Sequence, residues 1–75
     1  MPSVKEVWQE LIKDFKKQSF SSPPREARLF LSSVLEVEPS RLYLFWDEEF
    51  PEEKSARLEA LLKERLRGVP LQYLA

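Results

Sequence analysis

The chain of 75 residues contains no cysteine and no histidine. These two absences exclude disulfides, thiol nucleophiles, Cys/His zinc sites and acid–base catalysis by an imidazole group. Only one glycine is present, Gly68, so the chain has no glycine-rich loop that could hold a nucleotide or a cofactor. We therefore expect no catalytic, cofactor-binding or metal-binding residue in this chain.

A surplus of charge of one sign and a long apolar run are also absent. Twelve basic and thirteen acidic side chains give a net charge of −1, so no bulk field attracts nucleic acid. No apolar run reaches the roughly 20 residues that cross a membrane, and the charged first twenty residues do not resemble a signal peptide. The chain is expected to be cytoplasmic and monomeric, without direct contact with nucleic acid or membrane.

The residues that are present favour a packed helical domain. The hydrophobic fraction is 43%, the charged fraction is 33%, and six prolines divide the chain into short segments. Apolar side chains recur with helical spacing, and each segment has a plausible start or stop signal. The pattern predicts an all-α fold with four helices within residues 1–67, followed by an exit segment over 68–75.

The first helix is predicted over Val4–Lys17. Ser3 and Glu6 have the spacing of a capping box. A second helix is expected to start with Ser22 as its N-cap and Pro23 in its first turn, and to be ended by Pro39. A short third helix follows over 40–45. Its apolar residues, Leu44 among them, are expected to be wedged between the longer helices.

The last helix is predicted to start near Pro51 and to bury one face, formed by Ala56, Leu58, Leu61, Leu62 and Leu66. Gly68 can adopt the left-handed conformation that ends a helix, and Pro70 prevents its continuation. The apolar residues after this stop favour a segment that leaves the bundle toward another domain.

Three groups of side chains could serve binding. The acidic residues around 47–53 are interpreted as solvated groups that stabilise a helix start, with a metal site as the alternative. The basic residues of the last helix are interpreted as complementing its dipole. The alternatives are helix-turn-helix binding to DNA and, for Arg65 and Arg67, contact with a protein partner. Trp8 is assigned to the core, whereas Trp46 is a candidate partner-binding residue.

The run REARLFLSSVLEVEPSRLYLFWDEEF, together with LEALLKERLRGVPLQYL, resembles the N-terminal domain of bacterial peptide-chain release factor glutamine methyltransferases, the HemK family. The resemblance covers residue 25 to the end and, more loosely, the first helix. Its specific parts are Glu26-Ala27-Arg28 leading into Leu31, and, at the exit, Arg65 followed by Gly68-x-Pro70-x-x-Tyr73.

This resemblance implies a small bundle of four to five helices over residues 1–67, with a hinge or linker over 68–75 in which Gly68, Pro70 and Tyr73 are the candidate hinge residues. The hinge would join the bundle to a Rossmann-like domain that holds S-adenosylmethionine and an Asn-Pro-Pro-Tyr motif for the target glutamine. This chain contains no asparagine, so no catalytic residue carries over. The implied partners are a peptide-chain release factor and the methyltransferase domain of the parent protein. The module would help to position the release factor for methylation of its GGQ glutamine. An unrelated helical interaction or structural domain remains the alternative interpretation.

Overall fold

A computed structural model describes residues 2–69 of the chain. This part of the chain forms three α-helices and two 3-10 helices and contains no β-strand. The α-helices are α1 (Val4–Lys17), α2 (Pro23–Leu35) and α3 (Ser55–Leu66), and the 3-10 helices are η1 (Pro39–Phe45) and η2 (Glu52–Lys54). The all-α class that the sequence predicted is confirmed.

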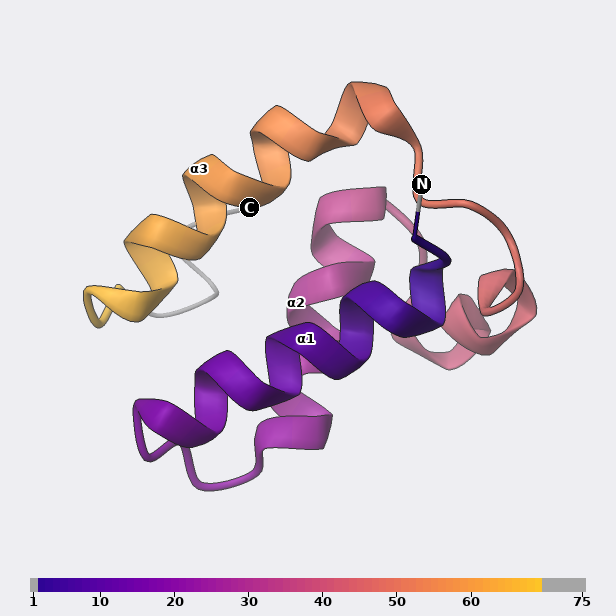
Figure 1. Cartoon of the computed structure of the whole chain (residues 1–75). Coiled ribbons are helices and arrows are strands. Elements are labelled where there is room, and N and C mark those ends of the chain that lie inside the picture. Colours follow the sequence, from indigo (N-terminus) through magenta and orange to yellow (C-terminus); the bar gives the residue numbers. More distant parts are fainter. Residues whose placement is uncertain (1, 70–75) are drawn as a thin grey trace.

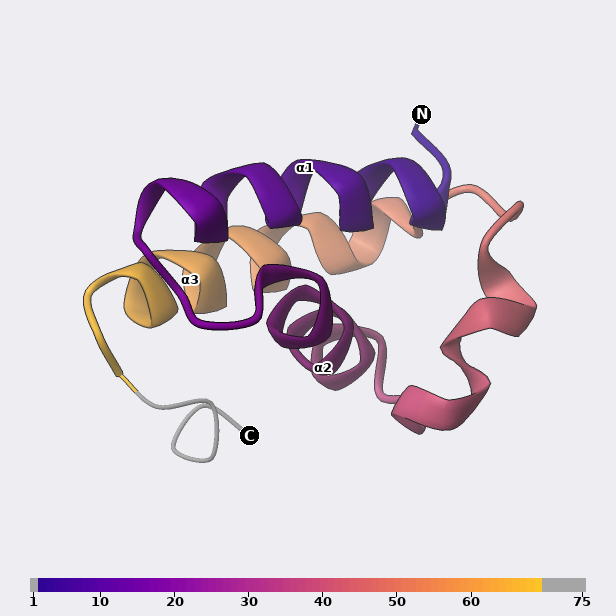
Figure 2. The ribbon, with the colours of Figure 1, turned by 90° about the horizontal axis from the view of Figure 1, so that it is seen from below.

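The three α-helices form two crossed layers. Helices α1 and α3 run in the same direction beside each other, and α2 lies crosswise against them (Figure 1). Viewed from below, α2 is seen almost end-on, and η1 lies at the end of the molecule where α1 begins (Figure 2). Helix α1 packs most extensively on α2, whereas α3 contacts α2 less.

Helix α1 begins with the predicted capping box. The Ser3 hydroxyl oxygen accepts a hydrogen bond from the Glu6 N–H at 3.1 Å, and the Glu6 carboxylate accepts one from the Ser3 N–H at 2.8 Å. The first two N–H groups of the helix, on Val4 and Lys5, donate to the carbonyl oxygens of Glu48 and Trp46. The loop after η1 therefore satisfies backbone donors that a helix start would otherwise leave unpaired.

The core lies mainly between α1 and α2. Phe15 and Phe30 meet edge to face with ring centroids 5.9 Å apart, and Phe20 stacks on Phe15 at 4.6 Å. The buried apolar residues are Val4, Val7, Leu11, Phe15, Ala27, Phe30, Leu31, Val34, Leu42 and Phe50. The buried hydroxyl group of Ser32 donates to the Arg28 and Leu29 carbonyl oxygens, so burial leaves it hydrogen-bonded.

Helix α2 ends earlier than the sequence predicted. Ser22 is its N-cap residue but makes no side-chain capping bond, and the helix stops at Leu35 rather than at Pro39. Glu36 adopts a left-handed conformation with φ 60°, and the Val37 N–H donates back to the Ser32 carbonyl at 3.0 Å. This Schellman-type ending turns Val37 back against the core, so the helix ends before the proline takes effect.

The predicted burial of two other segments is correct only in part, although the leucines of the last helix do pack against the core. None of the residues of α3 is buried: Ala56 is exposed, while Leu58, Leu61, Leu62 and Leu66 are only half-buried. In η1, Leu42 is buried as a wedged helix requires, but Leu44 is 58% exposed. Helix α3 packs against the core from outside, and η1 lies at one end of the molecule, so neither helix is enclosed on all sides (Figure 2).

Candidate protein-interaction site

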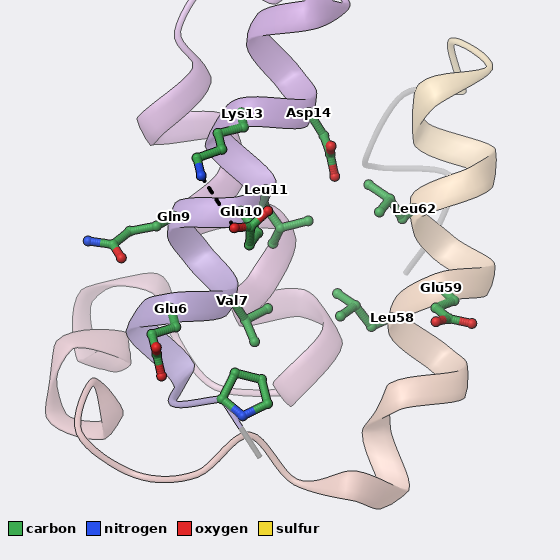
Figure 3. Close-up of a pocket in the computed structure, with 11 residues that line it drawn as sticks. Glu6, Val7, Gln9, Glu10, Leu11, Lys13, Asp14, Leu58, Glu59 and Leu62 are labelled. Atoms are coloured by element: carbon green, nitrogen blue, oxygen red, sulfur yellow. Dashed lines mark hydrogen bonds and ion pairs between the residues drawn. The ribbon is translucent and has the colours of Figure 1, made fainter.

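A groove of about 460 Å³ lies between α1 and α3 (Figure 3). Its apolar walls come from both helices: Val7 and Leu11 on α1 are four residues apart, and so are Leu58 and Leu62 on α3. Residues with this spacing share one helix face, so each helix presents a pair of aliphatic side chains to the groove. The half-buried state of Leu58 and Leu62 follows from this opening.

Helix α3 is held at its two ends. Before its start, Phe50 is buried and its N–H donates to the Pro2 carbonyl at 2.9 Å. Lys54 adds an ion pair with Glu36 at 3.4 Å. These contacts, those near the end of the helix and the half-buried leucines packed against the core hold α3 on the bundle, and a groove remains between α3 and α1.

The second attachment of α3 is made by Arg65. Its guanidinium group donates to the Glu26 carboxylate at 3.2 Å and lies 4.4 Å from the centre of the Phe20 ring. Only 17% of the Arg65 side chain is exposed. Arg65, a candidate for partner contact from the sequence, thus has its guanidinium group engaged within the bundle.

Arg67 is placed differently. Its side chain is 72% exposed and pairs with Glu64 one turn earlier at 2.9 Å. Such an exposed pair leaves the guanidinium group accessible to another molecule. The structure therefore does not bring Arg65 and Arg67 together at one surface, and the partner-binding role of each stays a prediction.

The rim of the groove carries mostly negative charge. Glu6, Glu10 and Asp14 follow one another at intervals of four residues along α1, and Glu59 lies on α3 (Figure 3). Lys13 is the basic residue among the groove-lining side chains, and it pairs with Glu10 at 3.4 Å. Four carboxylates and one ammonium group give the lining a net charge of about −3 at neutral pH.

The ionised state of Glu6 is supported locally. The pKa of its carboxyl group lies below the ordinary value, first because the Ser3 backbone N–H donates to it and second because the Ser3 side chain stabilises it. A lowered pKa keeps this rim residue negatively charged at neutral pH. The same two hydrogen-bonded residues thus start α1 and fix one charge of the groove.

Trp46, the third candidate for partner contact, lies against Trp8. The two indole rings are tilted, with centroids 5.1 Å apart. The Trp8 ring nitrogen donates to the Pro24 carbonyl oxygen at 3.1 Å. Both side chains are half-buried. Trp8 is therefore less buried than the core assignment predicted, and part of the Trp46 side chain is exposed to solvent.

An apolar surface on η1 was missed by sequence reasoning. Tyr43 is 62% exposed and Leu44 is 58% exposed. Pro39 signals the start of a short helix but not which side of it faces the core. The run of apolar residues predicted burial on all sides, but a surface helix of seven residues cannot bury all of its faces.

The acidic loop is built around its backbone. Its carbonyl oxygens at Trp46 and Glu48 accept from the start of α1, while the side chains of Asp47, Glu48 and Glu49 are exposed. Among residues 2–69, no group of three acidic side chains could hold a metal ion. In this same part of the chain, no helix is both long and apolar enough to cross a membrane.

Gly68 ends α3 with a positive φ of 99°, as the sequence predicted. The Gly68 and Val69 N–H groups donate to the Arg65 and Glu64 carbonyl oxygens at 3.1 and 3.2 Å, which is the Schellman pattern. Pro70 and Tyr73, the other two hinge candidates, lie outside the described residues. The hinge itself stays a prediction.

Comparison with known proteins identifies the family. The family model described as the PrmC N-terminal domain matches residues 6–75. The chain belongs to the PrmC N-terminal domain family. The resemblance found in the sequence is therefore confirmed, including the first helix, where it was looser.

Two curated relatives of this PrmC N-terminal domain are methyltransferases by name. A release factor glutamine methyltransferase of Aquifex aeolicus (strain VF5) is 36% identical over 63 residues, which cover 84% of this chain and 22% of the relative. A bifunctional methyltransferase of Rickettsia conorii is 32% identical over 72 residues, which cover 96% of this chain and 14% of the relative. The chain thus spans less than a quarter of either relative. No solved structure has significant similarity to it.

Proposed function

We propose that this domain is a substrate-recognition module of a release factor glutamine methyltransferase. It helps to hold a peptide-chain release factor while a separate domain methylates the glutamine of the GGQ motif. The observation that carries the proposal is the family match over residues 6–75, joined to a relative of that name which is much longer than this chain. A separate catalytic domain would account for the remaining length.

The described residues do not fit a site for S-adenosylmethionine. The resemblance implies that this cofactor is held by a Rossmann-like domain, whose binding loop follows a strand and is rich in glycine. Residues 2–69 contain no β-strand that such a loop could follow, and the single glycine ends α3. We therefore place cofactor binding and methyl transfer in the parent protein outside this domain, and no catalytic step in these residues.

The accessible surfaces suit a binding role. The groove between α1 and α3, the exposed Tyr43 and Leu44, and the partly exposed Trp46 offer apolar contact area on a stable helical frame. Aromatic residues of this kind are common at the centres of protein interfaces. Two linked modules that bind one partner gain affinity through their effective concentration, so each contact can be weak alone. The proposed cellular site is the cytoplasm, where release factors act on ribosomes.

The test compares the parent enzyme with a form that lacks residues 1–75. Deletion is expected to raise the Michaelis constant for an intact release factor. The reason is that it removes a contact that stabilises the enzyme–substrate complex and the transition state equally. S-adenosylmethionine binding, measured by calorimetry, should stay nearly unchanged. A short GGQ-containing peptide serves as the control substrate, because it cannot reach both modules. Unchanged kinetics toward the intact release factor would contradict the proposal and favour a role in folding.

A further inference from the structure

The groove between α1 and α3 is apolar on both sides: Val7 and Leu11, on its α1 side, are buried, whereas Leu58 and Leu62, on its α3 side, are half-buried and keep apolar surface accessible. Val7 and Leu11 face Leu58 and Leu62 across it (Figure 3). Helix α3 is attached on both sides of this stretch, by Phe50 before it and by Arg65 near its end. The groove is therefore a feature of the fold, and a ligand could enter it without detaching the helix.

The walls have the geometry that receives another helix. Helices α1 and α3 run in the same direction (Figures 1 and 2). Each contributes aliphatic side chains four residues apart to the groove (Figure 3). Rows with this spacing form ridges, and the ridges of a third helix can pack into the space between them. Many proteins bind an amphipathic helix in such a groove through residues at positions i, i+3 or i+4, and i+7.

The acidic residues at the rim of the groove favour a basic partner segment. Glu6, Glu10, Asp14 and Glu59 surround the apolar walls, and Lys13 is already paired with Glu10. Carboxylates at this density attract lysine or arginine and repel an acidic segment. Anionic lipid headgroups and nucleic-acid phosphates are disfavoured for the same reason.

Two other occupants fit poorly. In a symmetric dimer, the groove of a second copy of the chain would face this one. The carboxylates of the two rims would then repel each other. The last residues of this chain, 70–75, read PLQYLA and contain no lysine or arginine to match the rim.

We propose that the groove between α1 and α3 docks an amphipathic helix of a protein partner, with an apolar face flanked by lysine or arginine. This inference rests on the proposed recognition function and adds to it a site and the chemistry of the segment that is bound. The apolar face of the partner helix covers Leu58 and Leu62, and its basic side chains lie along Glu6, Glu10 and Asp14.

The experiment uses two synthetic helical peptides of about 14 residues, long enough for four turns. They share the same leucine face, and one carries lysine beside it where the other carries glutamate. Each is titrated into the isotopically labelled 75-residue chain, and backbone amide shifts are followed by NMR. The lysine peptide is expected to shift amides along the facing sides of α1 and α3, more strongly at about 50 mM than at about 500 mM salt. The glutamate peptide is expected to have no effect there.

A pair of variants separates local from bulk charge. The groove variant is Glu10→Lys with Glu59→Lys. The control is Glu38→Lys with Glu53→Lys, two exposed residues that do not line the groove. The pairs match, because Glu10 and Glu38 each pair with a basic residue three positions later and both variants change net charge equally. We expect the groove variant to weaken binding of the lysine peptide about five- to tenfold and the control to change it less than about twofold.

Several results would overturn the inference: no shifts with the lysine peptide, equal weakening in both variants, equal binding of both peptides, or shifts centred on Tyr43 and Trp46. Circular dichroism of each variant checks that its fold is kept. The outcome is separable from that of the deletion experiment. If the peptide does not bind but deletion still raises the Michaelis constant, the domain recognises its substrate through another surface.

Discussion

The Arg65 guanidinium group donates to the Glu26 carboxylate at 3.2 Å, across 39 positions of sequence. The same guanidinium group lies over the Phe20 ring, so one side chain joins α3 to α2 and to the turn between α1 and α2. None of the residues of α3 is fully buried, although Leu58, Leu61, Leu62 and Leu66 are half-buried against the core. The contacts at the two ends of α3 add to this packing, and the groove beside α1 lies along the part of the helix between them.

Replacing Arg65 by alanine should therefore destabilise the domain by about 1–3 kcal/mol, since a charge-assisted hydrogen bond and a cation–π contact are both lost. Arg67→Ala is the matched control: its pair with Glu64 is exposed, and its loss should cost less than about 0.5 kcal/mol. Urea unfolding of both variants, followed by circular dichroism, measures the difference. Equal effects of the two replacements would show that the contacts of Arg65 do not hold α3.

Burial distinguishes two leucines that the sequence treats alike. Leu31 on α2 is fully buried, whereas Leu61 on α3 is half-buried. Leu31→Ala should cost about 2–5 kcal/mol, as for other leucine truncations in a core. Leu61→Ala should cost clearly less, about 1–2 kcal/mol, because part of its surface already contacts water. Thermal unfolding of the two variants under the same conditions checks the order, and a larger loss for Leu61→Ala would contradict the structure.

The elements that the sequence predicted well are those fixed by local chemistry. The bounds of α1 follow from the Ser3–Glu6 capping box and from a regular apolar stripe, and the end of α3 follows from Gly68. The end of α2 could not be predicted in this way. Glu36 adopts a left-handed conformation that charged residues rarely adopt, because Val37 gains contact with the core.

The groove and the role of Arg65 depend on contacts that a single sequence does not display. A stripe of leucines on α3 predicts an apolar face but not how much of it is covered, since this depends on where the helix is attached. The pairing of Arg65 with Glu26 is likewise a matter of tertiary arrangement. The exposed Tyr43 and Leu44 were missed because η1 is too short for periodicity to define its inner side.

The start of α1 should make stability depend on pH. Hydrogen bonds from Ser3 lower the pKa of Glu6 in the folded state, so the folded carboxyl group binds a proton less readily than the unfolded one. Its contribution is present above the unfolded pKa and is lost as the pH falls through the folded pKa. In the Glu6→Gln variant, the free energy of unfolding should therefore fall less steeply as the pH is lowered through that acidic range. Urea unfolding at a series of pH values measures this dependence.

The Ser3 side of the same capping box offers an independent check. Ser3→Ala removes the hydroxyl group that caps the helix and should cost about 0.5–2 kcal/mol at neutral pH. Ser40→Ala, at an exposed position in η1, is the control and should change stability by less than about 0.5 kcal/mol. If the two variants are equally stable at neutral pH, the capping box contributes little and the pH effect must have another origin.

Helices α1 and α3 end in the same conformation with different residues. Ser19 after α1 has φ 61°, and Gly68 after α3 has φ 99°. A side chain in the left-handed region costs about 1–2 kcal/mol, whereas glycine adopts it freely but loses more backbone entropy on folding. Nothing lies within 4 Å of a Cβ atom placed on Gly68, so only the backbone opposes a substitution there.

Opposite effects are therefore expected at these two positions. Gly68→Ala should destabilise the domain by about 1 kcal/mol, and Ser19→Gly should stabilise it by about 0.5 kcal/mol, the smaller gain reflecting the entropy that the new glycine loses. Thermal unfolding measures both. In the parent enzyme, Gly68→Ala also tests the hinge, because it restrains the backbone where the bundle ends. If that variant keeps the Michaelis constant for release factor while its domain is destabilised, Gly68 serves only to end α3, and the bend between domains lies further along the chain.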